Sequence, residues 1–171
     1  MPKLTKKITI DSSIETIWET LSDFDEISHW ARNVSHSCLL SDLKQDVGTI
    51  RRIQQGSNVL TEVVTVWESP LLLAYEINGL PPVFKSITNT WTLAPHNDGT
   101  EIRLEVEILP KRRPATPLAA FACVLVSRFN YRMLIDLKNF QEKQKPYDDL
   151  REEVSILTSR LVQLESGSET L

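Results

Sequence analysis

The stretch from residue 117 to about residue 145 constrains the fold more than any other part of the sequence. It has no glycine or proline between Leu118 and Lys145. Pro117 suits a first helical turn, where its missing N–H is not needed. Apolar residues recur at steps of three and four, which predicts one apolar stripe along a helix. The members of this stripe are Ala122, Val126, Phe129, Met133, Leu137 and Phe140.

The two halves of this predicted helix differ in polarity. In the second half a polar row lies away from the stripe, made of Arg128, Arg132, Asp136, Asn139 and Lys143. In the first half, residues 118–126 are nine consecutive apolar residues, so this part has no polar face. Such a helix needs a large apolar surface to cover it, and the rest of the chain must supply that surface.

The segments before this helix have the patterns of strands and two short helices. Residues 4–10 alternate as a strand. Ser12 and Glu15 have the spacing of a capping box before a helix of about ten residues. Residues 23–30 predict a second short helix with Phe24, Ile27 and Trp30 facing inward. Six further strands are predicted between turn residues, at 34–41, 49–55, 59–67, 71–77, 84–93 and 100–109.

The last of these strands has the clearest pattern. Ile102, Leu104, Val106 and Ile108 alternate with charged residues, so one face is buried and the other is wet, as antiparallel sheets allow. We therefore predict an α+β fold, in which a strongly curved antiparallel sheet of about seven strands wraps around the long helix. This domain spans residues 1–145, and residues 146–171 form a helical extension.

Charge and composition restrict the classes of function. Residues 1–145 contain 17 acidic and 17 basic side chains, whereas residues 146–171 contain six acidic and two basic ones. Residues 1–145 are therefore neutral overall, which argues against nucleic acid as a partner. Cys38 and Cys123 lie in apolar contexts, which indicates free thiols in a reducing compartment. We find no signal-peptide pattern and no uninterrupted apolar run of membrane-spanning length, and expect a cytoplasmic protein.

Several short segments before the long helix form a wider pattern. They are Ile8 to Asp11, Ile14 to Phe24, Trp30, Val47-Gly48, Thr61 to Val63, Pro70, Ala74 to Glu76 and Asp98 to Thr100. Together they resemble the START-like, or SRPBCC, superfamily, which includes polyketide cyclase/dehydrase-type proteins and birch-pollen allergens. The resemblance implies a helix-grip fold with a cavity between the sheet and the long helix for an apolar small molecule. Members include lipid or sterol carriers, hormone receptors, quinone-binding proteins and aromatase/cyclases.

Motifs for cofactor, metal or covalent chemistry were sought without success. The five glycines are scattered, so no phosphate-binding loop is predicted. His29, His36 and His96 do not have metal-ligand spacing, and no G-x-S-x-G elbow is present. We therefore expect no metal and no cofactor. Because enzymes of the resembled family lack a covalent nucleophile in general, these absences leave catalysis open.

Polar residues predicted to face the cavity are the candidates for chemistry. His36 shares a face with Val34 and Cys38, so it is either a proton-transferring group or a hydrogen-bonded core histidine. Glu62 shares a face with apolar neighbours and needs a partner, such as Arg52 or a ligand hydroxyl. His36 and Glu62 are the catalytic candidates if the protein is an enzyme.

Further residues are predicted to line the cavity. Trp30 is either a pocket wall or a core aromatic residue, and the hydroxyl of Tyr75 either anchors a ligand or lies at the edge of the core. Asn89 and Trp91 share a face with Ile87 and Leu93 and are expected to line the cavity. The inward face of strands 49–55 and 84–93 is ambiguous, which affects Arg52 and Asn89 most. The long helix is expected to contribute Leu125, Phe129 and Met133.

Two segments outside the cavity suggest contacts with other molecules. The triplet Lys111-Arg112-Arg113 is either a solvated loop or, with the apolar helix start, a contact for an anionic membrane surface. Pro146 is expected to interrupt the helix. Beyond it, residues 147–165 carry an apolar seam with coiled-coil spacing that indicates a partner protein or a weak homodimer. The seam consists of Leu150, Val154, Leu157, Leu161 and Leu164.

These observations favour binding or transport of a hydrophobic small molecule, such as a lipid, isoprenoid or polyketide. Two alternatives belong to other classes. One is a polyketide cyclase or dehydratase acting in the same cavity, which would need a general acid–base pair. The other is a scaffold protein that acts through its C-terminal extension.

Overall fold

The computed structural model describes residues 2–79, 81–97 and 99–168 of the chain. Its strands are β1 (Lys3–Ile10), β2 (His36–Leu39), β3 (Ile50–Gln55), β4 (Asn58–Glu68), β5 (Leu72–Asn78), β6 (Phe84–His96) and β7 (Gly99–Pro110). Its helices are α1 (Ile14–Ser22), α2 (Ile27–Trp30) and α3 (Thr116–Ser168), with short 3-10 turns η1 (Phe24–Glu26) and η2 (Arg113–Ala115).

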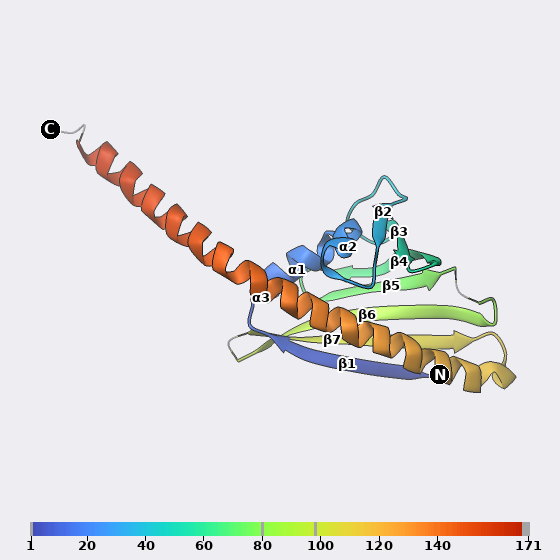
Figure 1. The fold of residues 1–171 in the computed structure, drawn as a ribbon. Helices are drawn as coiled ribbons and strands as arrows, with labels where there is room; N and C mark the ends of the chain where they lie inside the picture. The colour runs from blue at the N-terminus through green and yellow to red at the C-terminus, as the bar shows by residue number, and fades with distance from the viewer. Residues whose placement is uncertain (1, 80, 98, 169–171) are drawn as a thin grey trace.

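The seven strands form one antiparallel sheet in the order β1-β7-β6-β5-β4-β3-β2, and the sheet curves around α3 (Figure 1). β1 and β2 follow one another among the strands of the chain but lie at opposite edges, because α1, η1 and α2 cross between them. The predicted α+β fold and the predicted number of strands are confirmed.

The register of the sheet decides which side chains face α3. In β7, Ile102, Leu104, Val106 and Ile108 are fully buried, as the alternation predicted. In β6 the sequence did not decide which alternate residues face inward. The structure shows that Asn89 and Trp91 face inward with Ile87 and Leu93. In β3, Arg51 and Ile53 face inward, so Arg52 lies on the other face.

The first helices confirm the predicted segments with two adjustments. The N-cap of α1 is Ser13, whose hydroxyl accepts from the Thr16 N–H at 3.1 Å, so the capping box predicted at Ser12 is wrong by one residue. The N–H of Ser12 instead bonds back to the Ile10 carbonyl in the turn after β1. The helix predicted at 23–30 is divided into η1 and α2, and its three apolar residues are buried as expected.

Helix α3 is continuous from Thr116 to Ser168, so the interruption predicted at Pro146 is wrong. A proline removes one intrahelical hydrogen bond, and a helix can accommodate that loss because the neighbouring turns keep theirs. The expected domain boundary after residue 145 therefore falls within a helix that runs away from the sheet (Figure 1).

The buried face of α3 is rotated from the predicted apolar stripe. Met133 and Leu137 are buried as expected, but Phe129 is 45% exposed. The positions against the sheet include small residues, Ala119, Cys123 and Ser127, which let the helix approach β7 closely. The Cys123 thiol lies 3.7 Å from the Val106 carbonyl oxygen, and Cys123 and Cys38 are both free, with Cys38 half-buried.

Asp136 was predicted to belong to the polar row of α3, but its side chain is buried. Its carboxylate accepts from the backbone N–H of Arg32 at 3.1 Å and from Arg32 Nε at 2.7 Å. These bonds tie the segment after α2 to the middle of α3. A carboxylate can be buried here because both of its oxygens accept hydrogen bonds.

Candidate functional site

An interior cavity of about 370 Å³ lies between the concave face of the sheet and α3. Its apolar lining residues are Ile27, Ile53, Leu60, Ile77, Val126, Phe129 and Met133. Its polar lining residues are Asn33, Gln55, Asn58, Glu62, Asn89 and Asn130, and Gly56 completes the wall. The walls are thus mostly apolar, with a small number of hydrogen-bonding groups, as in sites for small hydrophobic ligands.

A buried ion pair supports one wall of this cavity. Arg51 on β3 and Glu62 on β4 are opposite each other in the register, and each residue is 3% exposed. Arg51 Nε donates to Glu62 Oε2 at 2.5 Å, and Arg51 Nη1 donates to the Phe24 carbonyl. The guanidinium also lies 3.7 Å from the centroid of the Phe24 ring, which is a cation–π contact. Glu62 faces inward with a basic partner, as predicted, but that partner is Arg51 rather than Arg52.

A hydrogen-bond network connects the sheet to α3 beside the cavity. The Tyr75 hydroxyl oxygen accepts from Trp91 Nε1 at 3.2 Å and from Asn89 Nδ2 at 3.4 Å. Asn130 Nδ2 on α3 donates to Asn89 Oδ1 at 2.8 Å, and Asn89 Nδ2 donates to Asn130 Oδ1 at 3.3 Å. The two amides therefore form a reciprocal pair that holds the first third of α3 over β6.

Tyr75 is a neutral phenol in this network. Burial raises the pKa of Tyr75 to about 12, and the negative charge of Glu62 contributes in the same direction. A phenol with this pKa does not lose its proton near neutral pH. Tyr75 therefore orders the amide of Asn89, which lines the cavity, and does not act as an anion.

Asn33 supplies polar atoms that the described protein residues leave without a partner. Its Nδ2 and Oδ1 atoms are both buried, and neither has a hydrogen bond to another described residue. Asn33 lines the cavity together with Asn130. Buried amides are nearly always satisfied, so this donor and acceptor are suited to a polar group of a bound molecule or to water.

The structure brings together some of the predicted site residues and separates others. Glu62, Asn89, Phe129 and Met133 line the cavity. Trp30, Tyr75 and Trp91 are buried beside it, and the rings of Trp30 and Trp91 pack edge to face with centroids 6.2 Å apart. Trp30 is therefore a core aromatic residue beside this cavity, and it also lines a separate groove between α1 and α3.

Two predicted site residues lie away from the cavity. Leu125 is exposed on the outer side of α3, because residues 118–126 are apolar on every face and periodicity could not orient them. His36 is exposed, since the inward positions of β2 are those of Ser37, opposite Ile53, and of Leu39, opposite Arg51. The predictions that Leu125 and His36 face the cavity are wrong, and the His36–Glu62 pair does not form.

Sequence reasoning missed Arg51, Asn33 and Asn130. Asn130 follows Val126 by four residues and precedes Met133 by three, so it was on the helix face that periodicity identified. Asn130 was missed because only apolar residues were assigned to that face. Arg51 could not be distinguished from Arg52 within the strand. Asn33 lies in a loop, where no periodicity applies. No group of three or more His, Cys, Asp or Glu side chains suited to a metal ion occurs within the described part of the chain.

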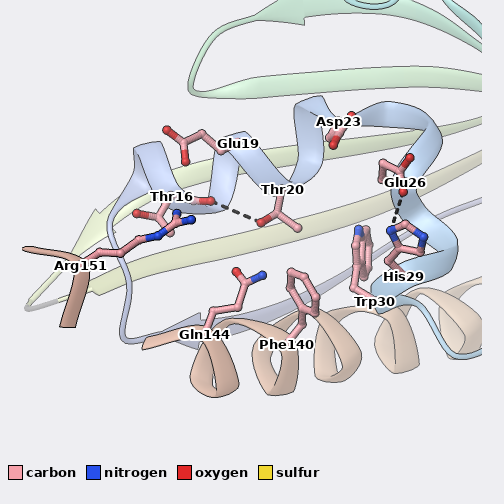
Figure 2. Close-up of a pocket in the computed structure, with 10 residues that line it drawn as sticks. All are labelled: Thr16, Glu19, Thr20, Asp23, Glu26, His29, Trp30, Phe140, Gln144 and Arg151. Atoms are coloured by element: carbon pink, nitrogen blue, oxygen red, sulfur yellow. Dashed lines mark hydrogen bonds and ion pairs between the residues drawn. The ribbon is translucent and has the colours of Figure 1, made fainter. Parts of the chain in front are cut away.

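A second hollow lies between α1 and the middle turns of α3 (Figure 2). It is an open groove of about 900 Å³, with acidic residues Glu19, Asp23 and Glu26 along α1 and η1, and Phe140 and Gln144 on α3. At one end, His29 Nδ1 contacts the carboxylate of Glu26 (Figure 2). This groove is larger but more open, whereas the more enclosed and mostly apolar walls of the interior cavity would remove more of a hydrophobic ligand's surface from water.

Comparison of the sequence with family models gives a match over residues 1–139 to the family described as polyketide cyclase/dehydrase and lipid transport. The chain belongs to this family. The match covers all seven strands and the part of α3 that lies over the cavity. The predicted membership of the START-like superfamily is therefore confirmed. No curated protein sequence matches the chain.

Solved structures of START-like proteins share the fold of this family member. A START superfamily protein from Mycobacterium smegmatis has a TM-score of 0.66 at 16% identity, covering 82% of this chain and 97% of that one. The di-domain ARO/CYC protein StfQ of the steffimycin biosynthetic pathway has a TM-score of 0.69 at 11% identity, covering 85% of this chain and 52% of its own. The aromatase/cyclase Zhui from Streptomyces has a TM-score of 0.65 at 13% identity, covering 83% and 94%. At these identities the likeness establishes the fold alone.

Proposed function

We propose that this protein binds and carries a hydrophobic small molecule that has a polar group at one end, such as a lipid, isoprenoid or polyketide. The observation that carries this proposal is the composition of the interior cavity. Seven apolar side chains supply a surface for the hydrophobic part of the ligand. The amide of Asn33, whose buried donor and acceptor have no partner among the described residues, is available for its polar end.

The size of the cavity agrees with such a ligand. A volume of about 370 Å³ is within the range of sites for drug-sized molecules, which begins at roughly 300 Å³. Burial of an apolar ligand contributes about 25 cal/mol for each Å² removed from water. The polar groups then fix the orientation of the ligand, because an amide left unpaired in the interior is costly.

An enzymatic function is the second candidate, and the similarity in fold to aromatase/cyclases supports it. The geometry of the charged groups favours binding instead. His36 is on the outer face of the sheet, and the Glu62 carboxylate is committed to Arg51. A carboxylate that is paired with a buried guanidinium is poorly suited to abstract a proton. If the carboxylate moved away or became neutral, the buried guanidinium would lose its counter-charge.

The proposal is tested by titrating the full chain with a hydrophobic fluorescent probe. We expect saturable binding of one probe per protein. Replacing Val126 with tryptophan should weaken that binding about tenfold or more, because the indole would occupy part of the cavity that Val126 lines. The matched control is Val124→Trp, two residues away on the same helix, where the side chain is 48% exposed.

Three results would contradict this prediction. They are the absence of saturable binding to folded protein, an unchanged affinity in the Val126→Trp variant, and an equal loss in the Val124→Trp control. To identify the carried molecule, native mass spectrometry of protein from its own source would be used. A co-purifying lipid is the expected result for a carrier, whereas a scaffold has no need of one.

The C-terminal part of α3 provides a second prediction, which concerns partners. Val154 and Leu157 of the predicted seam are exposed, and the side chains of Leu150, Leu161 and Leu164 lie outside those that the structure describes. Residues 146–171 carry six acidic and two basic residues, so two copies in parallel repel each other. We therefore propose a partner protein for this segment, with at most weak self-association that strengthens as salt screens the charges.

Sedimentation velocity of the full chain and of a chain ending at residue 145, at low and high salt, tests this second prediction. A monomer or a weak, salt-promoted dimer is expected for the full chain. A tight dimer that does not respond to salt and is lost on truncation would show that self-association is the role of the segment.

A further inference from the structure

The first turns of α3 present apolar side chains to solvent. Leu118, Phe121, Val124 and Leu125 are each at least 44% exposed, and Phe121 reaches 61%. The steps from Leu118 to Phe121 and from Phe121 to Leu125 are three and four residues, so these side chains form one row on the helix. The opposite side, with Ala119 and Cys123, is buried against the sheet. Soluble proteins seldom leave a contiguous row of large apolar residues uncovered without a function.

Basic residues surround this row. Between residues 108 and 135 the sequence contains five basic residues and no acidic one. Arg128 and Arg132 follow Leu125 at three and seven residues, and both are exposed on the same side of α3. Lys111 and Arg112 are exposed just before the helix begins, and the side chain of Arg113 lies outside those described. The rest of residues 1–145 has an excess of acidic residues, so the positive charge is local.

We propose that this face of α3 docks the protein on an anionic lipid surface. The apolar row, Leu118, Phe121, Val124 and Leu125, inserts into the boundary between headgroups and acyl chains. The cations at both ends, Lys111 and Arg112 on one side and Arg128 and Arg132 on the other, contact the anionic headgroups. Adjacent apolar and basic side chains on one helix are the pattern of interfacial helices.

The charge of the face decides against a second copy of this chain as its occupant. A symmetric dimer through this face would bring two identical basic patches together, and like charges across an interface are destabilising. The C-terminal part of α3 does not cover the face either, because it runs straight on from the other end of the helix (Figure 1). An anionic surface is the partner that complements both the charge and the apolar row.

The docking is peripheral. Residues 116–144 meet the length and composition of a membrane span, although no uninterrupted apolar run suggested one. However, one side of this helix, a third of its most apolar window, is buried within the fold, and the buried side carries Asn130, which is hydrogen-bonded to Asn89 of β6. The helix therefore keeps one side on the sheet and offers the other to the lipid.

The apolar row of α3 lies next to the interior cavity, so docking would bring the cavity close to the membrane. Phe129 lines the interior cavity and is also 45% exposed, one turn after Leu125. A hydrophobic molecule leaving the cavity past Phe129 would emerge beside the lipid-facing row. Transfer to a membrane would then avoid passage through water. This use rests on the proposed function, whereas the docking itself does not require a bound molecule.

Co-sedimentation of the full chain with lipid vesicles tests the docking. Vesicles of phosphatidylcholine alone are compared with vesicles that also contain phosphatidylglycerol, at low salt and at about 0.15 M salt. We expect binding to the anionic vesicles that weakens with salt. Each basic residue near such a surface contributes about fivefold to binding, so Arg128→Glu/Arg132→Glu should reduce the partition coefficient at least about 25-fold. Phe121→Ser should reduce it about tenfold.

Matched controls distinguish docking from general effects of charge and apolar surface. Lys44→Glu reverses an exposed charge elsewhere, and Leu71→Ser removes an apolar side chain that is 49% exposed outside α3. Both should bind vesicles within about twofold of the unchanged chain. Circular dichroism and probe titration verify that each variant is folded and retains its cavity. A failed probe titration of the unchanged chain would count against the carrier proposal, and vesicle binding would still be measured independently.

Several outcomes would overturn the docking proposal. They are equal binding to both kinds of vesicle, no binding to either, unchanged binding in the Arg128→Glu/Arg132→Glu and Phe121→Ser variants, and equal losses in the controls. Self-association that is lost in the Phe121→Ser variant, without vesicle binding, would assign the face to a protein contact instead.

Discussion

Replacing Glu62 with leucine is expected to lower the free energy of unfolding by about 3–5 kcal/mol, because it leaves the buried guanidinium of Arg51 without its carboxylate. The remaining described partners of Arg51 are the Phe24 carbonyl and the rings of Phe24 and Tyr75, and none of them carries a negative charge. For a chain of this length, such a loss lowers Tm by about 10–15 °C. Thermal and urea unfolding, followed by circular dichroism, measure both quantities.

The matched variant for this prediction is the double replacement Arg51→Met/Glu62→Leu. It removes both charges and keeps apolar volume in the interior, so its stability should lie within about 2 kcal/mol of the unchanged protein. Lys138→Met removes the exposed ion pair with Glu142 and an exposed hydrogen bond of 3.4 Å to the Thr9 carbonyl, and should change stability little. The interpretation would fail if the double variant were as unstable as the Glu62→Leu variant, since the loss would then come from packing and not from an unpaired charge.

Raising the pH above about 10 is expected to destabilise the protein through Tyr75. In the unfolded chain this phenol ionises with a pKa near its ordinary value of 10.0, whereas burial raises its pKa in the folded protein to about 12. Between these values the folded state keeps a proton that the unfolded state has released, so stability falls as pH rises. The contribution of the neutral phenol to the free energy of unfolding is therefore fully present below pH 10 and is lost progressively as the pH rises toward 12. Two pKa units correspond to about 2–3 kcal/mol.

The Tyr75→Phe variant isolates this contribution. It should be slightly less stable near neutral pH, because Trp91 Nε1 and Asn89 Nδ2 lose their acceptor. Its stability should then decline less steeply than that of the unchanged protein between about pH 9 and pH 12, by about 2–3 kcal/mol in total. Tyr131→Phe, at an exposed position on α3, provides the control for loss of a tyrosine. If the free energies of unfolding of the unchanged protein and of Tyr75→Phe fell in parallel as the pH rose, the buried phenol would not be the cause of the loss of stability.

Periodicity along the chain was sufficient to predict most of the elements and the side of the sheet on which several residues lie. Alternation in residues 100–109 placed four aliphatic side chains inward, and the apolar neighbours of Glu62 placed that carboxylate inward with a need for a basic partner. These inferences succeeded because side-chain direction within one strand or helix is a local property with a known period. The same periods, with the resemblance to START-like proteins, were sufficient for the fold.

Contacts between residues of different elements could not be predicted in this way, because they depend on how the elements pair and pack. Arg51 and Arg52 are neighbours of the same type, and only the pairing of β3 with β4 places Arg51 opposite Glu62. Alternation along the strand placed His36 on the same face as apolar residues, yet the pairing of β2 with β3 turns this face outward at His36. In α3, residues 118–126 are apolar on all sides, so close packing of Ala119, Cys123 and Ser127 on the sheet determines the orientation. A period identifies the two faces of an element, but contact with a second element decides which face is buried.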